Sequence, residues 1–356
     1  MYEDQANRRK RTILHVSEAF GGGVQTAVLS YISNSRQYSH GLVVRRRPSH
    51  DIGSRPDVTI EYVTGSIPVF LWKARRQIVR LSPDVVHLHS SYAGILRLLL
   101  PRTTNIVYTP HSYAFCRTDV SKVHRAMFWV IEMMLSRRRH LIAGVSPFEL
   151  HQANQLASST VSKRYLPNVS RDEPIRRVQA AVLSQPTVVM VGRIMAQKDP
   201  EFYLEAKKAS KTVARWIWIG DGDSSMRGLL ESAEIEVTGW LPNSEVLERV
   251  ANASLYFHCA KWEGAPVTVV EAASLDTPVL VRKISELDGL GFFPAGSNPE
   301  DAARSIDKFF EDSAFQQRVK VTTRESATVH SPTVQKTALK AIYGYIEDRE
   351  YAGERL

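Results

Sequence analysis

Short apolar runs alternate with longer amphipathic segments along the whole chain. In the first half, the apolar runs predict strands at residues 12–17, 41–46, 58–64, 85–90, 105–109, 141–145 and 164–167. Helical periodicity between these runs is clearest at residues 24–33, 69–81 and 122–136. Strands that alternate with helices are typical of parallel sheets covered by helices on both faces.

A second series of the same kind begins after the polar stretch 171–185, which we interpret as a linker. Its predicted strands are residues 187–191, 215–219, 236–238, 255–258 and 279–281. Its predicted helices, several of which begin at proline, aspartate, asparagine or serine, are residues 200–210, 225–232, 243–251, 267–274 and 299–310. The chain is therefore expected to form two doubly wound α/β halves. Ligands of such sheets bind beyond the carboxyl ends of the strands, so two facing halves would form a cleft between them.

The composition is that of a globular protein with room for two domains. The 356 residues are 43% hydrophobic and 23% charged, which excludes a disordered, fibrous or disulfide-stapled chain. Cys116 and Cys259 lie far apart without metal-ligand spacing, so a reducing, cytoplasmic location is expected. We find no signal-peptide pattern and no window of about 18–20 uncharged apolar residues. Any membrane contact would then be peripheral, at the inner face of the plasma membrane.

Positive charge is concentrated in the first half of the chain. Residues 1–180 contain 26 Lys and Arg against 12 Asp and Glu, whereas residues 181–356 contain 20 against 25. This asymmetry suggests an anionic partner for the first half, either a phospholipid surface or nucleic acid, unless the charge is simply solvated. Nucleic acid is disfavoured because the basic residues are scattered and no aromatic recognition motif lies among them.

The strongest chemical signal is a nine-residue segment that begins at Glu263 and ends at Glu271. Pro266 suits the first position of a helix, which would place Gly264 and Ala265 in a loop whose N–H groups face an anion. Glu263 would project from that loop and Glu271 from the second helical turn. Carboxylates beside a helix N-terminus offer acceptors for sugar hydroxyls and a positive dipole for phosphate. The alternative interpretation is a pair of solvated glutamates.

A second signal follows the predicted strand at residues 187–191. Arg193 and Lys198 come after Gly192 in the loop that leads to the next helix. Both side chains would reach one diphosphate, Arg193 with a planar fork of donors and Lys198 with a mobile point charge. In isolation, such a pair is more often solvated, but its position at the end of a strand favours a functional interpretation.

Taken together, these motifs resemble the group 1 retaining glycosyltransferases of GT-B fold. The resemblance rests on Gly-Arg at 192–193 with Lys198, Ile-Gly-Asp-Gly at 219–222, Thr-Gly-Trp-Leu at 238–241, Glu263 with Glu271, Gly-Gly-Gly-Val at 21–24, His-Leu-His-Ser at 87–90 and Thr-Pro-His at 109–111. It implies two facing Rossmann-like domains, an acceptor-binding domain at residues 1–175 and a nucleotide-sugar-binding domain at 176–331. Residues 332–356 would form a helix that crosses back to the first domain. It also implies transfer from a nucleotide sugar with retention of anomeric configuration and without a metal or other cofactor.

The resemblance further implies roles for individual residues. Arg193 and Lys198 would hold the donor diphosphate and stabilise the charge of the leaving group. Glu263 would lie at the transferred sugar, Glu271 would bind the ribose hydroxyls, and His111 would enter the cleft near the reacting sugar. The other donor-binding positions would be Gly22, Gly23, Gly192, Trp240, Leu241, Gly264, Ala265, Pro266 and Val267. UDP is the nucleotide that the family resemblance favours.

The sequence departs from the family pattern at three places that bear on donor identity. Asp199 stands where a glycine commonly follows the lysine, and Ala265 and Pro266 replace what is often a bulky residue and a glycine. Asp223 occupies a position often taken by proline. We expect these changes to leave phosphate binding intact and to bear on which sugar is accepted, chiefly at Ala265.

Two groups of residues invite a metal-site interpretation. Asp221 and Asp223 superficially resemble the DxD metal motif of another glycosyltransferase class, but a glycine-rich turn after a strand favours turn residues. His87 and His89 share one face of a predicted strand, yet the sequence indicates no third ligand. Histidines that serve the sheet are therefore favoured over a metal site.

The acceptor is expected at the first domain, because the N-terminal domain usually receives it in this family. The segment at residues 109–115 resembles enzymes of bacterial surface polysaccharide assembly, which implies a saccharide or a polyprenyl-diphosphate-linked saccharide as acceptor. The basic amphipathic helix predicted at 122–136 and the arginines at 137–139 would face an anionic membrane, or the helix would pack on the sheet with its basic end solvated. A nucleotide-sugar-binding protein without turnover, and a hydrolase or phosphorylase of the same fold, remain alternatives.

Overall fold

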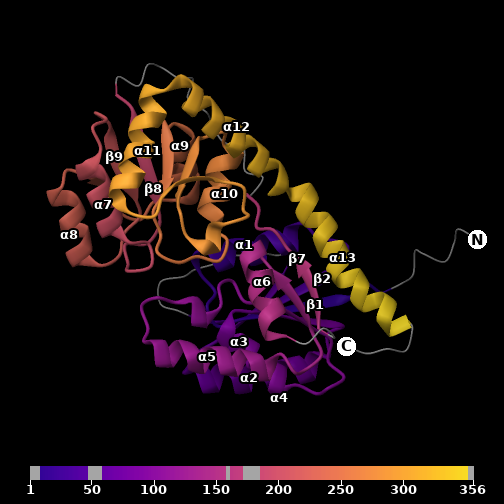
Figure 1. The fold of residues 1–356 in the computed structure, drawn as a ribbon. Helices are drawn as coiled ribbons and strands as arrows, with labels where there is room; N and C mark the ends of the chain where they lie inside the picture. Colours follow the sequence, from indigo (N-terminus) through magenta and orange to yellow (C-terminus); the bar gives the residue numbers. More distant parts are fainter. Residues whose placement is uncertain (1–8, 47–57, 158–160, 171–184, 352–356) are drawn as a thin grey trace, which may run out of the picture.

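The computed structural model describes residues 9–46, 58–157, 161–170 and 185–351, and within these ranges the chain forms two parallel sheets (Figure 1). The linker expected at 171–185 lies, except for Gln185, outside the described residues. Each sheet carries helices on both faces, so the predicted α/β class of two Rossmann-like domains is confirmed.

The first sheet has seven strands in the order β3-β2-β1-β4-β5-β6-β7. The strands are β1 (Thr12–Ser17), β2 (Ser39–Arg45), β3 (Thr59–Val63), β4 (Val85–His89), β5 (Ile106–Thr109), β6 (Leu141–Gly144) and β7 (Ser162–Tyr165). The helices are α1 (Gly22–Ser33), α2 (Ile67–Leu81), α3 (Ser91–Gly94), α4 (Leu96–Leu99), the 3-10 turn η1 (Ala114–Cys116), α5 (Lys122–Leu135) and α6 (Pro147–Leu156). We call this unit the N-terminal domain.

The second sheet has six strands in the order β10-β9-β8-β11-β12-β13. The strands are β8 (Thr187–Val191), β9 (Arg215–Ile219), β10 (Glu236–Val237), β11 (Leu255–His258), β12 (Val279–Arg282) and β13 (Phe293–Gly296). The helices are α7 (Pro200–Ala209), α8 (Ser224–Ser232), α9 (Asn243–Ala251), α10 (Val267–Ser274), the 3-10 turn η2 (Ser285–Leu287), α11 (Pro299–Glu311) and α12 (Ser313–Val329). We call this unit the C-terminal domain.

Helix α13 (Pro332–Tyr351) follows α12 and runs from the C-terminal domain back along the N-terminal domain (Figure 1). Leu339, Ile342 and Tyr343 are fully buried against the first sheet, in one cluster with residues of β1, β4, β5 and β6. The Tyr343 hydroxyl also lies 2.9 Å from Nδ1 of His87 on β4. The chain therefore links the two domains a second time through a helix that is part of the first domain's core.

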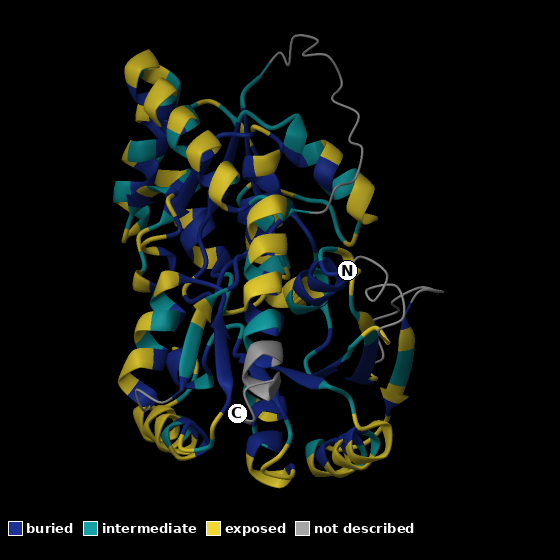
Figure 2. Ribbon diagram, turned by 90° about the vertical axis from the view of Figure 1, so that its right-hand side faces the viewer, coloured by how far each residue is buried: buried dark blue, intermediate teal, exposed yellow. Residues whose placement is uncertain are grey.

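Hydrophobic cores lie on both faces of each sheet, with buried strands between helices whose outer faces are exposed (Figure 2). In the first sheet, α2 and α6 cover one face, and α1 and α13 cover the other. In the second, α7, α8 and α11 cover one face, and α9 and α10 cover the other. The expected strands are present with ends shifted by at most two residues, because burial on both faces gives nearly continuous apolar runs.

Three features of the fold differ from the sequence-based expectation. Strand β13, with the sequence Phe-Pro-Ala-Gly, was not predicted because proline and glycine disfavour strands; it is tolerated as an edge strand of its sheet. Helix α12 was also missed, although Asp312 caps it by accepting from the amides of Ala314 and Phe315. Pro266 is the N-cap of α10, not its first helical residue.

Candidate active site

The two domains touch where loops at the carboxyl ends of their strands meet. A Cβ atom on Gly264 would lie 2.9 Å from the amide nitrogen of Ser112 and 3.1 Å from the carbonyl carbon of His111, so only glycine allows this approach. A Cβ on Gly23 would lie 3.9 Å from the side chain of Val267. The predicted residues of α1, of the β5 loop and of the loop before α10 are therefore brought together at one junction.

Lys198 and Glu263 form an ion pair at this junction, although 65 residues separate them in sequence. Nε2 of His258, the last residue of β11, lies 3.2 Å from the same carboxylate. Burial disfavours ionisation of Glu263, but the nearby Lys198 and the bond with His258 outweigh it and lower the pKa of the carboxyl to about 2. Glu263 is thus a buried carboxylate that stays ionised because a cation accompanies it.

The loop between β8 and α7 positions Lys198. A Cβ atom on Gly192 would lie 3.2–3.3 Å from the stem of Lys198, so the missing side chain makes room for the lysine. Asp199, one of the departures from the resembled family pattern, has φ +53°, a left-handed conformation that glycine adopts more readily than other residues. Its carboxylate compensates by binding Nη1 of Arg282 at 2.6 Å, with Lys261 at 3.5 Å. The ion pair of Asp199 with Arg282 therefore holds the loop in a backbone conformation that a glycine would adopt without a side-chain contact.

Asp221 and Asp223 are engaged within the turn that they were predicted to form. Asp221 pairs with Arg227 at 2.9 Å, and Asp223 caps α8 by accepting from the amide of Met226 at 3.0 Å. A Cβ on Gly222 would lie 2.1 Å from the carbonyl oxygen of Ile194, so this glycine allows two loops of the sheet edge to touch. Both carboxylates therefore have partners within the chain, as expected of turn residues.

Arg193 and Trp240 lie next to each other on the surface of the C-terminal domain. The guanidinium carbon of Arg193 is 6.0 Å from the centre of the Trp240 ring, and both side chains are exposed. Leu241 packs against the core on the α9–α10 side of the sheet. The exposed cation and the exposed aromatic face are available to a ligand without any rearrangement of the core.

Helix α10 presents its N-terminus at the junction. Ala265, Pro266 and Val267 are all buried, and the carbonyl of Ala265 accepts from the side-chain amide of Asn168 at 2.8 Å. Glu271 lies in the second turn of α10, as predicted, and is 7% exposed. The helix start is thereby fixed against the N-terminal domain.

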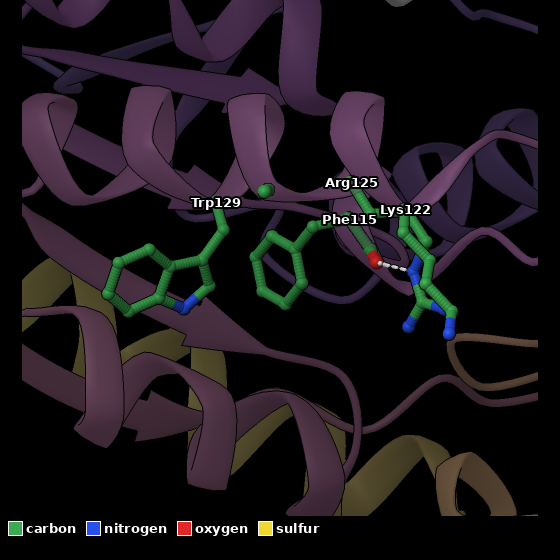
Figure 3. A pocket seen from close by; sticks show the side chains of 5 residues that line it. Phe115, Lys122, Arg125 and Trp129 are labelled. Atoms are coloured by element: carbon green, nitrogen blue, oxygen red, sulfur yellow. Dashed lines mark hydrogen bonds between the residues drawn. The ribbon is translucent and has the colours of Figure 1, made fainter.

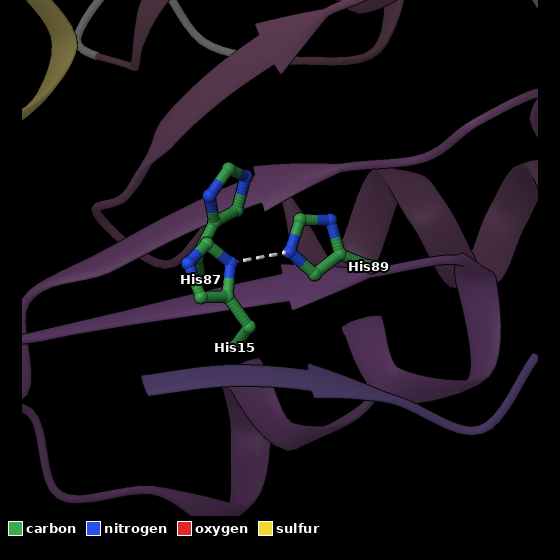
Figure 4. Close-up of side chains that lie close together, drawn as sticks. All are labelled: His15, His87 and His89. Atoms are coloured by element: carbon green, nitrogen blue, oxygen red, sulfur yellow. Dashed lines mark hydrogen bonds between the residues drawn. The ribbon is translucent and has the colours of Figure 1, made fainter. Parts of the chain in front are cut away.

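His111 has φ +50° in the turn after β5 and is half-buried. Its Nε2 atom lies 3.1 Å from Nδ1 of His89, and the His89 ring is tilted against that of His87, with 4.1 Å between the ring centres. Figure 4 shows that His15, on the neighbouring strand β1, joins His87 and His89; the nitrogen atoms of the three lie within 4.8 Å of one another. A third histidine is thus present that the sequence did not indicate, since only strand pairing brings β1 beside β4.

This histidine group does not require a metal to explain its contacts. His87 uses Nδ1 on the Tyr343 hydroxyl and Nε2 on the Thr109 hydroxyl, at 2.9 and 2.8 Å. Nδ1 of His15 lies 3.0 Å from Nε2 of His89. Metal-ligating nitrogens need free lone pairs that converge on one point, whereas here hydrogen bonds occupy these atoms. Absence of a metal from the reaction nevertheless stays a prediction.

A small pocket of about 250 Å³ lies beside η1, between that turn and the first half of α5 (Figure 3). Its walls are Phe115, Lys122, Arg125, Ala126 and Trp129. Arg125 is oriented by a 2.9 Å bond from its Nε to the carbonyl oxygen of Phe115. The pocket therefore combines two cationic side chains with two aromatic walls.

The apolar stripe of α5 faces solvent and does not pack on the sheet. Val123 is 78% exposed and Met134 49%, and the intervening members Met127, Val130 and Ile131 are exposed as well. The packed side of α5 instead carries Glu132 and Leu135. Of the arginine triplet, Arg137 and Arg139 are exposed, whereas Arg138 donates to the carbonyl of Arg97 at 2.7 Å. Of the two alternatives for this helix, the one in which the stripe packs on the sheet is therefore wrong for these residues.

Three residues of the junction were missed by sequence reasoning. His258 was read only as a strand residue, and Asn168 lay in a segment without a motif, yet Asn168 binds Tyr31 at 3.0 Å as well as Ala265. Glu149 accepts from the amide of Ser112, and burial raises its pKa to about 7. No sequence signal marked Asn168 or Glu149, because their partners lie on distant segments.

Two family models match consecutive parts of the chain. Residues 22–157 match the model described as Glycosyltransferase Family 4, and residues 171–326 match the model described as Glycosyl transferases group 1. Together they include the loops of both domains that meet at the junction.

Two curated relatives and one solved structure are similar to this chain over more than half of its length. The chain is 23% identical to an uncharacterised 41.2 kDa protein of the cps region of Klebsiella pneumoniae, over 77% of this chain and 82% of that protein. It is 21% identical to the UDP-Gal:alpha-D-GlcNAc-diphosphoundecaprenol alpha-1,3-galactosyltransferase of Escherichia coli, over 57% of this chain and 58% of that protein. HepE of Anabaena in complex with UDP-glucose superposes with a TM-score of 0.76 at 13% identity, over 94% of this chain and 99% of that one. Among the described residues, none of the helices is both long and apolar enough to span a membrane.

Proposed function

We propose a specific activity for this chain, which belongs to the group 1 glycosyltransferases and has the GT-B fold. It is a glycosyltransferase of the kind that acts in bacterial polysaccharide synthesis. The proposal is that it transfers a sugar, with retention, from a UDP-sugar to a lipid-linked saccharide. The observation that carries the proposal is the convergence of Lys198, Glu263, the start of α10 and His111 at one junction between the domains.

Lys198 and Arg193 would act on the donor diphosphate. A lysine ammonium has three N–H donors, so Lys198 can keep its bond to Glu263 and still donate to a phosphate oxygen. Arg193, which is exposed, would add a planar pair of donors. As the bond between sugar and phosphate breaks, negative charge grows on the leaving diphosphate, and preorganised donors there stabilise the transition state.

Glu263 would accept hydrogen bonds from hydroxyls of the transferred sugar. The low pKa of its carboxyl keeps it an acceptor at neutral pH. Because its charge is already committed to Lys198 and His258, we assign it no nucleophilic role. Glu271 would bind the ribose, and the surface around Trp240 and Leu241 would receive the base. The printed UDP-Gal donor of the E. coli relative and the UDP-glucose complex of HepE support UDP as the nucleotide.

A lipid-diphosphate-linked saccharide is the proposed acceptor. The α5 pocket would lie against this acceptor, with its aromatic walls on the apolar part and with Lys122 and Arg125 placed to pair with the diphosphate. The exposed apolar stripe of α5 would contact the lipid or the membrane that contains it. The E. coli relative acts, by its name, on a diphosphoundecaprenol-linked sugar, which supports this class of acceptor.

Donor binding is tested by thermal unfolding with a panel of nucleotide sugars in the presence of a chelator. A ligand at 100 times its dissociation constant stabilises the native state by about 2.7 kcal/mol. We expect a UDP-sugar to stabilise the wild type and a Glu325→Gln control, which changes an exposed residue of α12, but not Glu271→Gln. Stabilisation by nucleic acid instead of any nucleotide sugar would refute the proposed function, and binding without product would leave a donor-binding protein.

Acceptor binding is tested by steady-state kinetics with a short-chain polyprenyl-diphosphate saccharide. Replacing Lys122 and Arg125 together by glutamine should raise the KM for this acceptor and leave the KM for the donor unchanged. Arg139→Gln, which removes an exposed positive charge outside the pocket, is the matched control. If all variants use the lipid-linked acceptor equally well, the pocket does not bind it.

A further inference from the structure

Four histidines form a hydrogen-bonded line across the first sheet, which we call the histidine relay: His111, His89, His15 and His40. Nε2 of His111 lies 3.1 Å from Nδ1 of His89, and Nε2 of His89 lies 3.0 Å from Nδ1 of His15. Nε2 of His15 lies 3.1 Å from Nδ1 of His40. The relay crosses the strands in the order in which they pair, from the end of β5 through β4 and β1 to β2. Figure 4 shows the central bond, between His15 and His89.

The far end of the relay fixes the direction of every bond in it. Nε2 of His40 lies 3.0 Å from the backbone carbonyl oxygen of Ser35, which can only accept. The Ser35 hydroxyl, 3.2 Å from the same nitrogen, donates its own hydrogen to the carbonyl oxygen of Tyr31 at 2.6 Å, so Nε2 of His40 carries the hydrogen of this contact. A neutral imidazole has one N–H, so Nδ1 of His40 must accept from Nε2 of His15. The same argument applies to each ring in turn. It requires that the rings be neutral, and burial lowers the pKa of all four histidines, that of His111 to about 3.

The near end of the relay leaves one ring atom for a ligand. Since Nε2 of His111 donates to His89, Nδ1 of His111 is the unprotonated nitrogen, and it has no hydrogen-bond partner among the described residues. The backbone of His111 touches Gly264, the neighbour of Glu263, so this ring belongs to the junction. His87 stays outside the relay, because the Tyr343 and Thr109 hydroxyls take both of its nitrogens.

We propose that the histidine relay sets the tautomer of His111, so that Nδ1 of His111 accepts a hydrogen bond from a hydroxyl of the transferred sugar. His89, His15 and His40 are then positioning residues that act through His111, and the carbonyl of Ser35 is the anchor that gives the relay its direction. The identity of the hydroxyl-bearing ligand rests on the proposed function. The direction of the relay does not, because it follows from the chain's own contacts.

The first test is the protonation pattern of the wild-type protein, measured by NMR with ¹⁵N-labelled histidine at neutral pH. The shifts should show Nε2 protonated and Nδ1 unprotonated in all four relay histidines. Assignment uses single variants of each ring. A relay histidine that carries its hydrogen on Nδ1, or on both nitrogens, would overturn the proposal without any variant having to fold.

The second test reverses the relay from its far end. Arginine has donors only and stays charged, so His40→Arg would donate both to the Ser35 carbonyl and to Nε2 of His15. Every bond would then turn around, and the hydrogen of His111 would move to Nδ1. His40→Gln is the conservative variant, because its amide offers an accepting oxygen and a donating nitrogen and so preserves the direction.

We expect His40→Arg to change the ¹⁵N pattern of His111 and to lower kcat about tenfold, the typical effect of one hydrogen bond. The pattern and kcat of His40→Gln should resemble those of the wild type. If His40→Arg is folded and the His111 pattern is unchanged, the relay does not set the tautomer. If the pattern changes and kcat does not, Nδ1 has no role in transfer. A failure of the proposed function can be distinguished from these outcomes. In that case the wild-type protein would transfer no sugar, whereas the NMR spectra would still show Nε2 protonated in all four relay histidines.

Discussion

Replacing Lys198 by methionine tests the central ion pair of the junction. The change keeps most of the side-chain volume but leaves the carboxylate of Glu263, which is 7% exposed, with His258 as its one remaining side-chain partner in the part of the chain that the structure describes. Removing one partner of a buried pair costs about 3–5 kcal/mol, because the remaining charge is buried without compensation. The pKa of Glu263 agrees in sign, because it is lowered despite burial and Lys198 is the largest of the contributions that lower it. We expect a loss of about 3 kcal/mol in the free energy of unfolding.

The assay is urea unfolding of wild type, Lys198→Met, Glu263→Leu and the double variant, together with donor binding for each. The double variant removes both charges, so it should recover most of the stability that Lys198→Met loses. It should not recover donor binding, because the diphosphate has lost a cation in both. This separation distinguishes a lysine that only supports Glu263 from one that also binds the donor.

The pH dependence supplies a further check on the same pair. The pKa of Glu263 is lowered in the folded chain, so its stabilising effect is complete above its ordinary pKa and is lost as the pH falls from 4.5 towards 2. The difference in stability between wild type and Lys198→Met should therefore shrink over that interval. The reasoning is refuted if Lys198→Met is as stable as the wild type at pH 7, or if the double variant binds donor as well as the wild type does.

Three further predictions concern the protein as a whole. Burial lowers the pKa of the fully buried His15, His87 and His89, so the free energy of unfolding should fall as the pH drops below 6.5. The expected loss is about 1.4 kcal/mol for each of these histidines at pH 5.5. A free energy of unfolding that stays constant between pH 7.5 and 5.5, measured with urea, would contradict this. Arg193→Ala, which alters an exposed side chain, should lower turnover by about 10²–10³ and leave Tm unchanged; an active variant would show that Arg193 does not stabilise the leaving group. Transfer should continue in excess EDTA, and loss of activity that Mg²⁺ or Mn²⁺ restores would disprove metal independence.

The sequence predicted much of this protein's local structure. Buried parallel strands are short apolar runs, and helices such as α9 and α10 begin and end at the predicted residues, 243–251 and 267–274. The elements it missed have sequences that disfavour their own conformation, as the Phe-Pro-Ala-Gly strand β13 does, or lack a clear apolar face, as α12 does. Helices and strands depend mainly on residues that are close in sequence, so the sequence alone predicts where they lie.

The sequence predicted those residues of the candidate site that belong to motifs at the ends of strands. Lys198, Glu263 and Glu271 were identified in this way, and the structure joins the first two in one ion pair. The motifs did not reveal His258 as a partner of Glu263, because that contact depends on how the loop after β11 folds back. Nor did they show that the stripe of α5 is exposed, because an apolar stripe can be covered by the sheet or by a partner outside the chain and the pattern does not distinguish the two.

The sequence by itself determined the two α/β series, the concentration of positive charge in the first half and the motifs that carry the family resemblance. Only the tertiary structure decided which histidines meet. His15, His40, His89 and His111 are separated by up to 96 positions, and strand order alone brings them into one line. The direction of that line depends on a backbone carbonyl, that of Ser35, whose identity as an acceptor is independent of its side chain. Contacts between backbone and distant side chains leave no pattern in a sequence, because any residue at that position could supply the same oxygen.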